Sequence, residues 1–499
     1  MREYQLFIDG EFADAADGKT FETRNPSDGS TIATVARAGR EDIDRAVAAA
    51  RKAADAGTWA NMPPRERTKI LLKMADLLQD QQSELSELEA MDAGHTVRMA
   101  NLFTVPMAIF HWREMVEMGE RIDYTEQVAS NIFPAPSWGF VEREPYGVCA
   151  GIIPWNFPLL MCVWKAAPAM ATGNCMILKP SPYTPITALE LARVAQEAGL
   201  PKGVLQVVPG TGPIAGEALV TDERVDKIAF TGSTGVGRRI MQLASATIKK
   251  VTLELGGKSA NILLDDADLD IAVPGALWAT FLHQGQICHS GTRCFVPASL
   301  YDEVVARMVE LAEGMKVGSA MDFESDMGPV IDRRQLDTIQ RYIQAGQDEG
   351  AKLLTGGGVP DGVPEGGYYV EPTIFGEVDN SMKIAQEEIF GPVLSVIRYE
   401  SVEDAVRMAN DTIYGLAGAV WSRDIPRATS VARRLKTGTV WINDYHLISA
   451  QAPFGGYKQS GLGRELGRWG LDEFLQSKYI QVDQTPSKAQ KFWYQVIGL

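Results

Sequence analysis

From residue 147 onward, short apolar runs alternate with longer runs of helical length, and glycine or proline stands at the joints. In the first half of this region, the expected strands are 148–153, 175–178, 204–208, 225–230 and 251–255. The expected helices between them are 159–170, 186–198, 214–220 and 236–244. This alternation predicts parallel βαβ units in a doubly wound sheet, the usual site of dinucleotide binding.

A second alternating region follows between residues 259 and 444. Its expected strands are 260–264, 293–296, 393–399, 417–421 and 439–442, and its expected helices are 302–313, 333–349, 402–410 and 425–435. An Ala- and Leu-rich helical region, 40–120, precedes the first sheet. The predicted fold class is therefore α/β, with two doubly wound domains in a chain long enough for several cores.

Charge and cysteine usage exclude several classes of function. The net charge of −16 argues against a nucleic-acid partner, because such binding needs clustered Lys and Arg. Five cysteines without a C-x-x-C pair and five scattered histidines predict neither a metal site nor a disulfide framework. Reduced thiols favour a reducing compartment, so we expect a cytoplasmic protein.

No membrane span or secretory signal is expected. Residues 145–164 carry no charge, but Pro154, Asn156 and Pro158 interrupt them. A buried strand, a turn and the start of a buried helix fit this pattern better than a span. The first ten residues contain acids and no long apolar core, unlike a signal peptide.

Two features at strand ends point to a dinucleotide. A glycine turn, T-G-S-T-G-V-G at 231–237, connects a strand to a helix whose N–H groups can bind phosphate. Its spacing differs from G-x-G-x-x-G, and a plain tight turn explains the glycines equally well. Lys179 ends another strand and could reach a phosphate or ribose, or it could be a solvated surface lysine.

Cys288 differs from the other cysteines in its surroundings. Small and polar residues flank it in G-Q-I-C-H-S-G-T-R at 285–293, so the sulfur can be accessible as a nucleophile. Cys149, Cys162, Cys175 and Cys294 lie in apolar runs and are expected to be buried. A Cys–His pair would need a partner histidine, but the side chain of adjacent His289 would point away in an extended segment, and His283 lies at an expected helix end.

A carboxylate and an amide complete the candidate chemistry. Glu254 lies inside an apolar strand, where burial would raise its pKa and suit a general base; the alternative is an ion pair with a Lys or Arg. Asn156 lies at a strand end between two prolines, with an NH₂ group to donate, although it could simply cap the turn.

Together these segments resemble the aldehyde dehydrogenase superfamily, of the NAD(P)-dependent hydrolytic type, over nearly the whole chain. The matching motifs are P-W-N-F-P at 154–158, K-P-S at 179–181, F-T-G-S-T at 230–234, L-E-L-G-G-K at 253–258, G-Q-I-C at 285–288 with Arg293, E-E-I-F-G-P-V at 387–393 and P-F-G-G-Y-K-Q-S-G at 453–461.

The resemblance implies a catalytic sequence. Cys288 attacks the aldehyde carbon, Asn156 and the Cys288 N–H stabilise the oxyanion, and hydride leaves for the nicotinamide. Glu254 then activates the water that hydrolyses the thioester. Members that transfer the acyl group to coenzyme A usually lack this Glu, so a free acid is the expected product.

The resemblance also implies ligand-binding residues. The expected cofactor residues are Ile153, Pro154, Trp155, Lys179, Ser181, Gly212, Phe230, Thr231, Gly232, Ser233, Val236, Gly237, Leu255, Gly256, Glu388 and Phe390. The cofactor is expected to be NAD, but Pro182 stands where NAD-selective members often have a Glu, which leaves NADP open. The expected substrate tunnel is Phe157, Met161, Trp164, Leu282, Ile287, His289, His446 and Ile448, which favours a medium-sized apolar or aromatic aldehyde.

By the same resemblance, residues 1–123 and 144–257 form the NAD(P)-binding domain and 258–445 the catalytic domain. Residues 124–143 and 446–499 form a bridging segment that makes dimers or tetramers, and the apolar residues 492–497 agree with subunit contact. Three other readings remain: a coenzyme A-acylating dehydrogenase, a non-catalytic nucleotide-binding scaffold, and a thiol hydrolase without cofactor.

Overall fold

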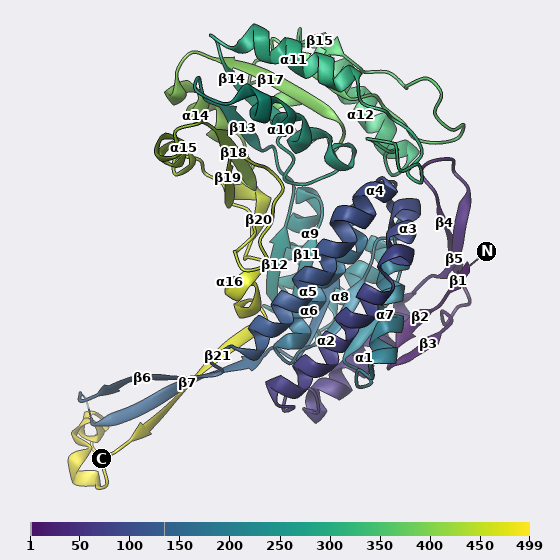
Figure 1. Ribbon diagram of the computed structural model, residues 1–499. Coiled ribbons are helices and arrows are strands. Elements are labelled where there is room, and N and C mark those ends of the chain that lie inside the picture. Colours follow the sequence, from purple (N-terminus) through teal and green to yellow (C-terminus); the bar gives the residue numbers. More distant parts are fainter. Residues whose placement is uncertain (1, 134) are drawn as a thin grey trace.

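In the computed structural model, which describes residues 2–133 and 135–499, a mixed sheet of eight strands forms the base of the molecule (Figure 1). Its strand order is β20-β12-β11-β8-β9-β10-β2-β3. The strands are β2 (Leu6–Ile8), β3 (Glu11–Ala13), β8 (Val148–Ile152), β9 (Cys175–Lys179), β10 (Leu205–Val207), β11 (Lys227–Thr231), β12 (Lys250–Glu254) and β20 (Gly461–Leu462). The five central strands β8 to β12 are parallel, as predicted, and the order reverses between β8 and β11. Ligands of such sheets bind at the carboxyl ends of the strands beside this reversal.

Helices cover both faces of the first sheet, and the sequence explains the most buried one. All residues of α6 (Pro158–Ala171) are buried, which accounts for the charge-free run at 145–164. The predicted helix 214–220 begins instead as a π-helical turn, Gly212–Gly216, followed by α8 (Glu217–Thr221). The other helices of this part are α1 (Arg40–Ala56), α2 (Pro64–Asp80), α3 (Gln82–Ala93), α4 (Val97–Met99), α5 (Val105–Glu120), α7 (Ile186–Ala198) and α9 (Thr234–Ala244). Across the described residues, no helix has the length and apolar character that crossing a membrane requires.

A second sheet lies above the first in Figure 1, with strand order β15-β16-β17-β14-β13-β18-β19. Its strands are β13 (Ala260–Leu263), β14 (Arg293–Pro297), β15 (Lys352–Thr355), β16 (Thr373–Gly376), β17 (Val393–Tyr399), β18 (Ala417–Trp421) and β19 (Thr439–Ile442). Its helices are α10 (Leu269–Phe281), α11 (Tyr301–Glu313), α12 (Arg333–Asp348), α13 (Lys383–Gln386), α14 (Val402–Asn410) and α15 (Ile425–Ala432). All its strand pairs are parallel except β15 with β16. The two doubly wound sheets confirm the predicted fold class.

The remaining strands form two small sheets. At the N-terminus, β1 (Arg2–Tyr4), β5 (Thr31–Ala36) and β4 (Thr20–Arg24) form a sheet that the sequence did not predict. An antiparallel sheet of β6 (Thr125–Asn131), β7 (Ser137–Pro145) and β21 (Leu475–Asp483) forms an arm that projects from the body (Figure 1). Before β21, the chain adds β20 to the edge of the first sheet, where it pairs with β12. The following helix, α16 (Gly467–Asp472), lies against α5 and α6.

A close backbone contact joins the loop before β14 to the loop before β17. Gly285 has φ 71°, and a Cβ atom added there would lie 2.1 Å from the carbonyl oxygen of Gly391. Its neighbours His283 and Gln284 also have positive φ, of 51° and 55°. This tight left-handed segment therefore requires glycine at position 285.

We predict that Gly285→Ala destabilises the protein by about 2 kcal/mol or more, because the methyl group meets a fixed carbonyl in a strained conformation. Thermal unfolding followed by circular dichroism measures the effect. Gly314→Ala is the matched control, since its φ is −78° and the nearest atom to an added Cβ is 3.5 Å away. Equal melting temperatures for the two variants would contradict the proposed constraint.

Candidate active site

Cys288 lies in a turn between the left-handed segment and β14. Two hydrogen bonds anchor this loop: Gln284 Nε2 donates to the Gly94 carbonyl at 3.0 Å, and Gln286 Oε1 accepts from the Ile331 N–H at 3.0 Å. Cys288 is partly exposed, whereas the other four cysteines are buried, as predicted, and all five are free thiols. The loop therefore presents one accessible sulfur on an anchored backbone.

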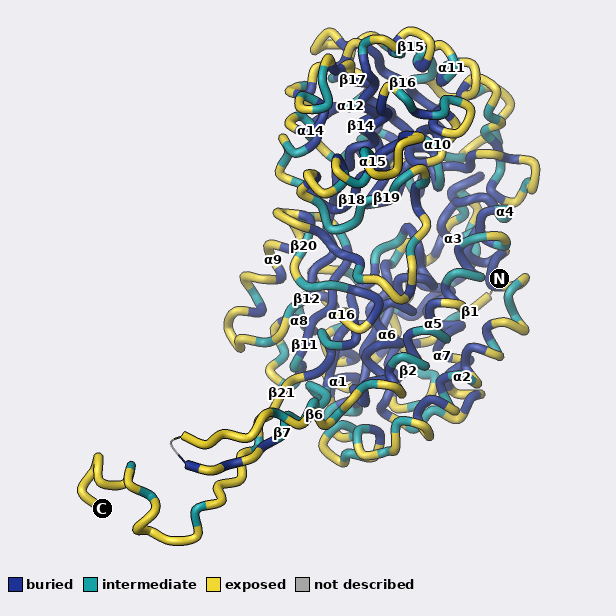
Figure 2. The backbone as a smooth tube through the Cα atoms, turned by 60° about the vertical axis from the view of Figure 1, so that its left-hand side comes forward, coloured by how far each residue is buried: buried dark blue, intermediate teal, exposed yellow. Residues whose placement is uncertain are grey.

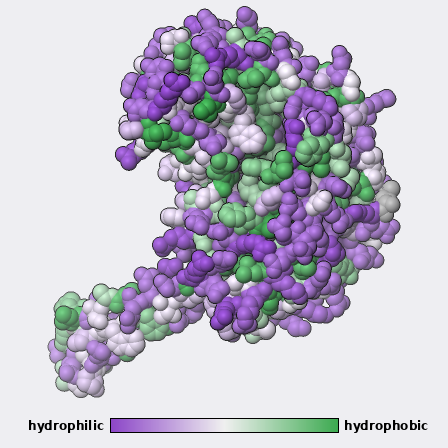
Figure 3. Space-filling model, in the orientation of Figure 1, coloured by the Kyte–Doolittle hydropathy of each residue, from purple (hydrophilic) through white to green (hydrophobic). Residues whose placement is uncertain are grey.

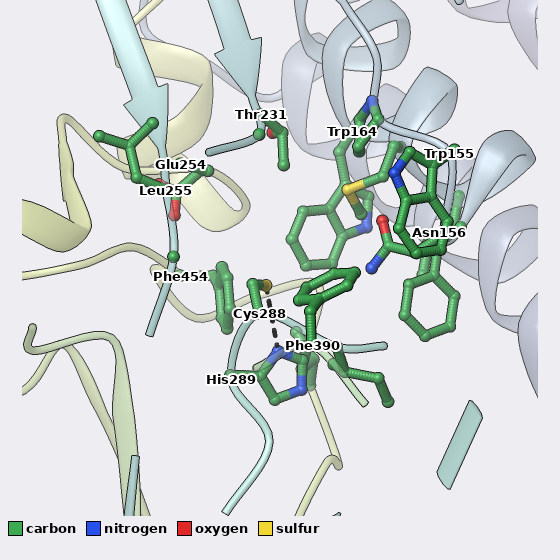
Figure 4. Close-up of a pocket in the computed structure, with 18 of the residues that line it drawn as sticks. Trp155, Asn156, Trp164, Thr231, Glu254, Leu255, Cys288, His289, Phe390 and Phe454 are labelled. Atoms are coloured by element: carbon green, nitrogen blue, oxygen red, sulfur yellow. Dashed lines mark hydrogen bonds between the residues drawn. The ribbon is translucent and has the colours of Figure 1, made fainter. Parts of the chain in front are cut away.

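A cavity of about 260 Å³ surrounds this sulfur, between the carboxyl ends of the first sheet and the second sheet (Figure 4). It brings together the three predicted catalytic residues Cys288, Glu254 and Asn156. All eight predicted tunnel residues line it: Phe157, Met161, Trp164, Leu282, Ile287, His289, His446 and Ile448.

Glu254 is the last residue of β12 and is 4% exposed. One of its carboxylate oxygens, Oε2, is buried without a hydrogen-bond partner. Burial, reinforced by the Glu465 carboxylate, raises the pKa of Glu254 well above its ordinary value. Within the described residues, Glu254 forms no ion pair with a Lys or Arg; Lys165 pairs with Glu465 instead and donates to Thr231 Oγ1 at 2.6 Å. In its carboxylate form, Glu254 therefore binds a proton more strongly than an exposed carboxylate does.

Asn156 follows β8 and is 5% exposed. Its Nδ2 donates to the Gln286 carbonyl at 2.8 Å, which fixes the amide beside the Cys288 loop. An amide nitrogen has two N–H groups, so the second remains to stabilise a negative oxygen.

The surroundings of Cys288 differ from expectation in one respect. His289 was expected to point away, but residues 288 and 289 form a turn rather than an extended segment. The Cys288 Sγ atom consequently lies 3.7 Å from His289 Nδ1 (Figure 4). Burial and the Glu388 and Glu254 carboxylates raise the pKa of the Cys288 thiol.

Nine predicted cofactor residues line the same cavity: Pro154, Trp155, Thr231, Gly232, Ser233, Leu255, Gly256, Glu388 and Phe390. Glu388 accepts the Gly257 N–H at 3.0 Å, and the rings of Trp155 and Phe390 meet edge to face at 5.2 Å. Burial raises the pKa of Glu388 to about 7.

The other seven predicted cofactor residues do not line the cavity. Ile153, Phe230 and Gly237 are buried, whereas Gly212 and Val236 are exposed. Ser181 accepts the Tyr183 N–H at 3.2 Å. Lys179 ends β9, where its Nζ donates to the carbonyls of Pro180 and Gly210 at 2.7 and 2.9 Å, and burial lowers its pKa to about 8.

The first sheet has room for a dinucleotide where β8 and β11 end. The Ser233 side chain caps α9 by accepting the Val236 N–H at 3.4 Å, and Ser233, Gly235 and Val236 at this helix N-terminus are exposed, which leaves its other N–H groups accessible to an anion. An added Cβ at Gly212 or at Gly235 would meet no atom within 4 Å. This open space beside the backbone, with the helix N-terminus and Lys179, fits a dinucleotide with two phosphates.

Six further residues line the cavity that the sequence did not single out: Phe103, Met107, Leu160, Gln335, Phe454 and Glu465. Phe454 lies in the matched segment 453–461, so its motif was a usable signal. Phe103, Met107 and Gln335 lie on helices of ordinary composition, and only the packing of the helices brings them to the cavity.

Comparison with known proteins agrees with this site. The model of the aldehyde dehydrogenase family matches residues 12–480. A betaine aldehyde dehydrogenase of Bacillus subtilis (strain 168) is 44% identical over 490 residues, covering 98% of this chain and 99% of the relative. The mitochondrial aldehyde dehydrogenase of Homo sapiens is 44% identical over 487 residues, covering 97% and 92%.

A solved structure extends the likeness to three dimensions. The NAD+ complex of an aldehyde dehydrogenase from Bacillus cereus superposes with a TM-score of 0.94, at 44% identity and 97% coverage of both chains. Matches of this extent in sequence and fold leave one assignment: the chain belongs to the aldehyde dehydrogenase family.

Proposed function

We propose that this enzyme, an NAD-dependent aldehyde dehydrogenase by family, oxidises medium-sized apolar or aromatic aldehydes to free acids through a thioester on Cys288. The observation that carries the proposal is the single cavity that contains Cys288, Glu254 and Asn156 within a largely apolar lining. Each of the three side chains has the chemistry of one step.

Bond formation comes first. The Cys288 sulfur attacks the aldehyde carbon, and negative charge develops on the aldehyde oxygen. The Asn156 amide, already oriented by the Gln286 carbonyl, stabilises that oxygen together with the Cys288 N–H. Bound NAD supplies the hydride acceptor. We assign its binding to the sixteen residues expected above, with Glu388 and Phe390 on the nicotinamide side.

Hydrolysis follows at the thioester. Glu254 accepts a proton from a water molecule, whose oxygen adds to the thioester carbon and releases the acid. The unpartnered Glu254 Oε2 in a buried setting supports this role, because a group with a raised pKa is a stronger base. The presence of this carboxylate also favours hydrolysis over acyl transfer to coenzyme A.

An apolar depression beside the cavity supports an apolar substrate. It shares Phe103, Met107 and Ile448 with the cavity wall, so the two lie side by side. At its rim, Leu102, Phe110 and Leu447 are 66%, 54% and 57% exposed. Hydrophobic groups also gather in the hollow between the two halves of the molecule (Figure 3). Binding an apolar aldehyde would remove this surface from water.

The arm supports the proposal that the enzyme is a homodimer or homotetramer. Many of its residues are exposed (Figure 2). The exposed fraction is 75–86% for four apolar residues near its end, Ile132, Phe133, Val496 and Ile497. A second copy could cover these side chains. A cytoplasmic location stays a prediction that rests on the five free thiols.

The reaction is tested by following absorbance of NADH with aliphatic, aromatic and charged aldehydes. We expect the highest kcat/KM with apolar or aromatic aldehydes, and no activity in Cys288→Ala. Cys175→Ala, at a buried cysteine outside the cavity, should stay active. Full activity of Cys288→Ala would refute the nucleophile. A preference for betaine aldehyde would refute the substrate class and point to cation–π binding by the aromatic lining.

We predict that Glu254→Gln slows steady-state turnover by about 100-fold or more and leaves a rapid burst of NADH, because thioester formation precedes the step that needs the base. In the wild type, hydrolysis accelerates as pH rises through the raised pKa of Glu254, since only the carboxylate accepts the proton. The variant should lose that pH dependence. Glu217→Gln, at a surface carboxylate paired with Arg239, is the control. Loss of the burst itself would contradict this role.

Pro182 generates a prediction about cofactor choice. We expect Pro182→Glu to raise the ratio of kcat/KM for NAD over NADP by about tenfold or more, because a carboxylate accepts from ribose hydroxyls and repels a 2′-phosphate. Pro182→Gln is the matched control, since an amide accepts a hydrogen bond without carrying charge. An unchanged ratio in Pro182→Glu would show that position 182 lies away from the ribose.

A further inference from the structure

Two histidines connect the Cys288 sulfur to the protein backbone in one hydrogen-bonded chain. Cys288 Sγ lies 3.7 Å from His289 Nδ1, His289 Nε2 lies 3.0 Å from His446 Nδ1, and His446 Nε2 lies 3.2 Å from the Ala279 carbonyl oxygen. The chain thus begins at the proposed nucleophile and ends at a group that can only accept.

The last contact determines where every proton in this chain resides. A carbonyl oxygen accepts, so His446 Nε2 carries a hydrogen and, in a neutral ring, His446 Nδ1 is an acceptor. His289 Nε2 must then donate to it, which leaves His289 Nδ1 as an acceptor facing the sulfur. The only arrangement that satisfies all three contacts with neutral rings is a thiol S–H donating to His289.

The surroundings keep both rings in place and neutral. His289 and His446 are 6% and 2% exposed, and burial lowers the pKa of both, that of His446 to about 3. Trp441 and Phe454 contact the His289 ring, while Trp278 and Tyr445 contact that of His446. The Tyr445 hydroxyl also donates to the His289 carbonyl at 2.7 Å.

The backbone conformation of His446 is a second observation that the surroundings impose the position of its ring. His446 has φ 66°, in the left-handed region that side chains other than glycine rarely adopt. Such a conformation costs about 1 kcal/mol or more and persists where the surroundings impose it, which happens most often at functional sites.

We propose that His289 is the base that takes the thiol proton of Cys288 as the sulfur attacks, and that His446 is the positioning residue that holds His289 in the accepting tautomer. The inference rests on the proposed role of Cys288 as nucleophile and adds a separate base for that first step. Nucleophile, base and orienting group then stand in the order of a catalytic triad.

The protons and electrons balance over the cycle. As the sulfur–carbon bond forms, the S–H bond breaks and its proton moves to His289 Nδ1, while the carbonyl electron pair moves to the aldehyde oxygen. The carbonyl then re-forms as hydride, with two electrons, leaves to NAD, the oxidant of the family reaction. Water adds to the thioester, and its proton passes to Glu254 and on to solvent. When the carbon–sulfur bond breaks, the sulfur recovers its proton from His289.

Two bases then serve two steps. The carboxylates that act on the sulfur, Glu254 and Glu388, both raise the pKa of the thiol, so they oppose a free thiolate. His289 avoids this cost because the sulfur loses its proton only as it bonds to the aldehyde carbon, so no free thiolate forms. The titratable groups that face the His289 ring are Cys288 and His446. Those that act on the Cys288 sulfur are Glu254 and Glu388.

The test is the rate at which iodoacetamide alkylates Cys288, measured by peptide mass spectrometry across pH 5 to about 11, in His289→Asn and in the wild type. With base assistance, the wild type should react at a rate that changes little around neutral pH. His289→Asn keeps an oxygen that accepts the S–H but loses the base, so only thiolate reacts. We expect alkylation about 10- to 100-fold slower at pH 7 and convergence of the two rates at the alkaline end.

His446 is tested by rescue. His446→Leu removes the acceptor for His289 and should slow alkylation at pH 7 about tenfold, whereas His446→Asn offers an oxygen near the place of Nδ1 and should recover most of the rate. His111→Asn is the matched control, because its ring is also buried and accepts from Trp164 Nε1 at 2.9 Å without touching the sulfur. Its alkylation profile should follow that of the wild type.

The outcomes separate this inference from the proposed function. If Cys288→Ala retains aldehyde oxidation, the nucleophile itself is wrong. If Cys288→Ala is inactive but His289→Asn has the wild-type alkylation profile and the wild-type NADH burst, only the base is wrong. Tryptophan fluorescence on NAD binding and thermal unfolding show that each variant is folded, so a slow profile in a folded protein supports the base.

Discussion

Exclusion of water from the junction of the two sheets determines the chemistry of this site. Burial raises the pKa of the Cys288 thiol and of Glu254, raises that of Glu388 to about 7, and lowers those of His289 and His446. Every shift favours the neutral form, because charge is costly away from water. The site therefore opposes standing charge, and a carboxylate held in it is a strong base.

The two sheets share the work of positioning these groups. The first sheet supplies Glu254 and Asn156 at the ends of parallel strands, and the second carries the Cys288 loop on β14. Cross-connections fix the distance between them: Asn156 Nδ2 donates to the Gln286 carbonyl, and Gln284 Nε2 donates to the Gly94 carbonyl. The amide of Asn156 thus ties together two parts of the site that lie 130 residues apart in the chain.

Much of this could be predicted from the sequence because strand–helix periodicity and motifs are local. The parallel strands and the buried helix α6 follow from patterns that each lie within a short segment, and most residues around the cavity were expected from the resemblance that the motifs carry. Packing between distant segments could not be predicted. The three-residue strands β2 and β3 give too little pattern, and the helix residue Met107 reaches the cavity only through tertiary contacts. The contact between Cys288 and His289 depends on a turn at these two residues. Their positions in the sequence suggested instead that the two side chains point apart.

The cost of charge in this site also accounts for two separate bases. A thiolate stabilised at rest would require a nearby cation, and the cavity lining contains no Lys or Arg among the described residues. The nearby lysine, Lys165, is paired with Glu465. The thiol must instead lose its proton at the moment of attack, to a group within hydrogen-bond distance. His289 meets that requirement at the sulfur, which leaves the unpartnered carboxyl of Glu254 available for water in the later step.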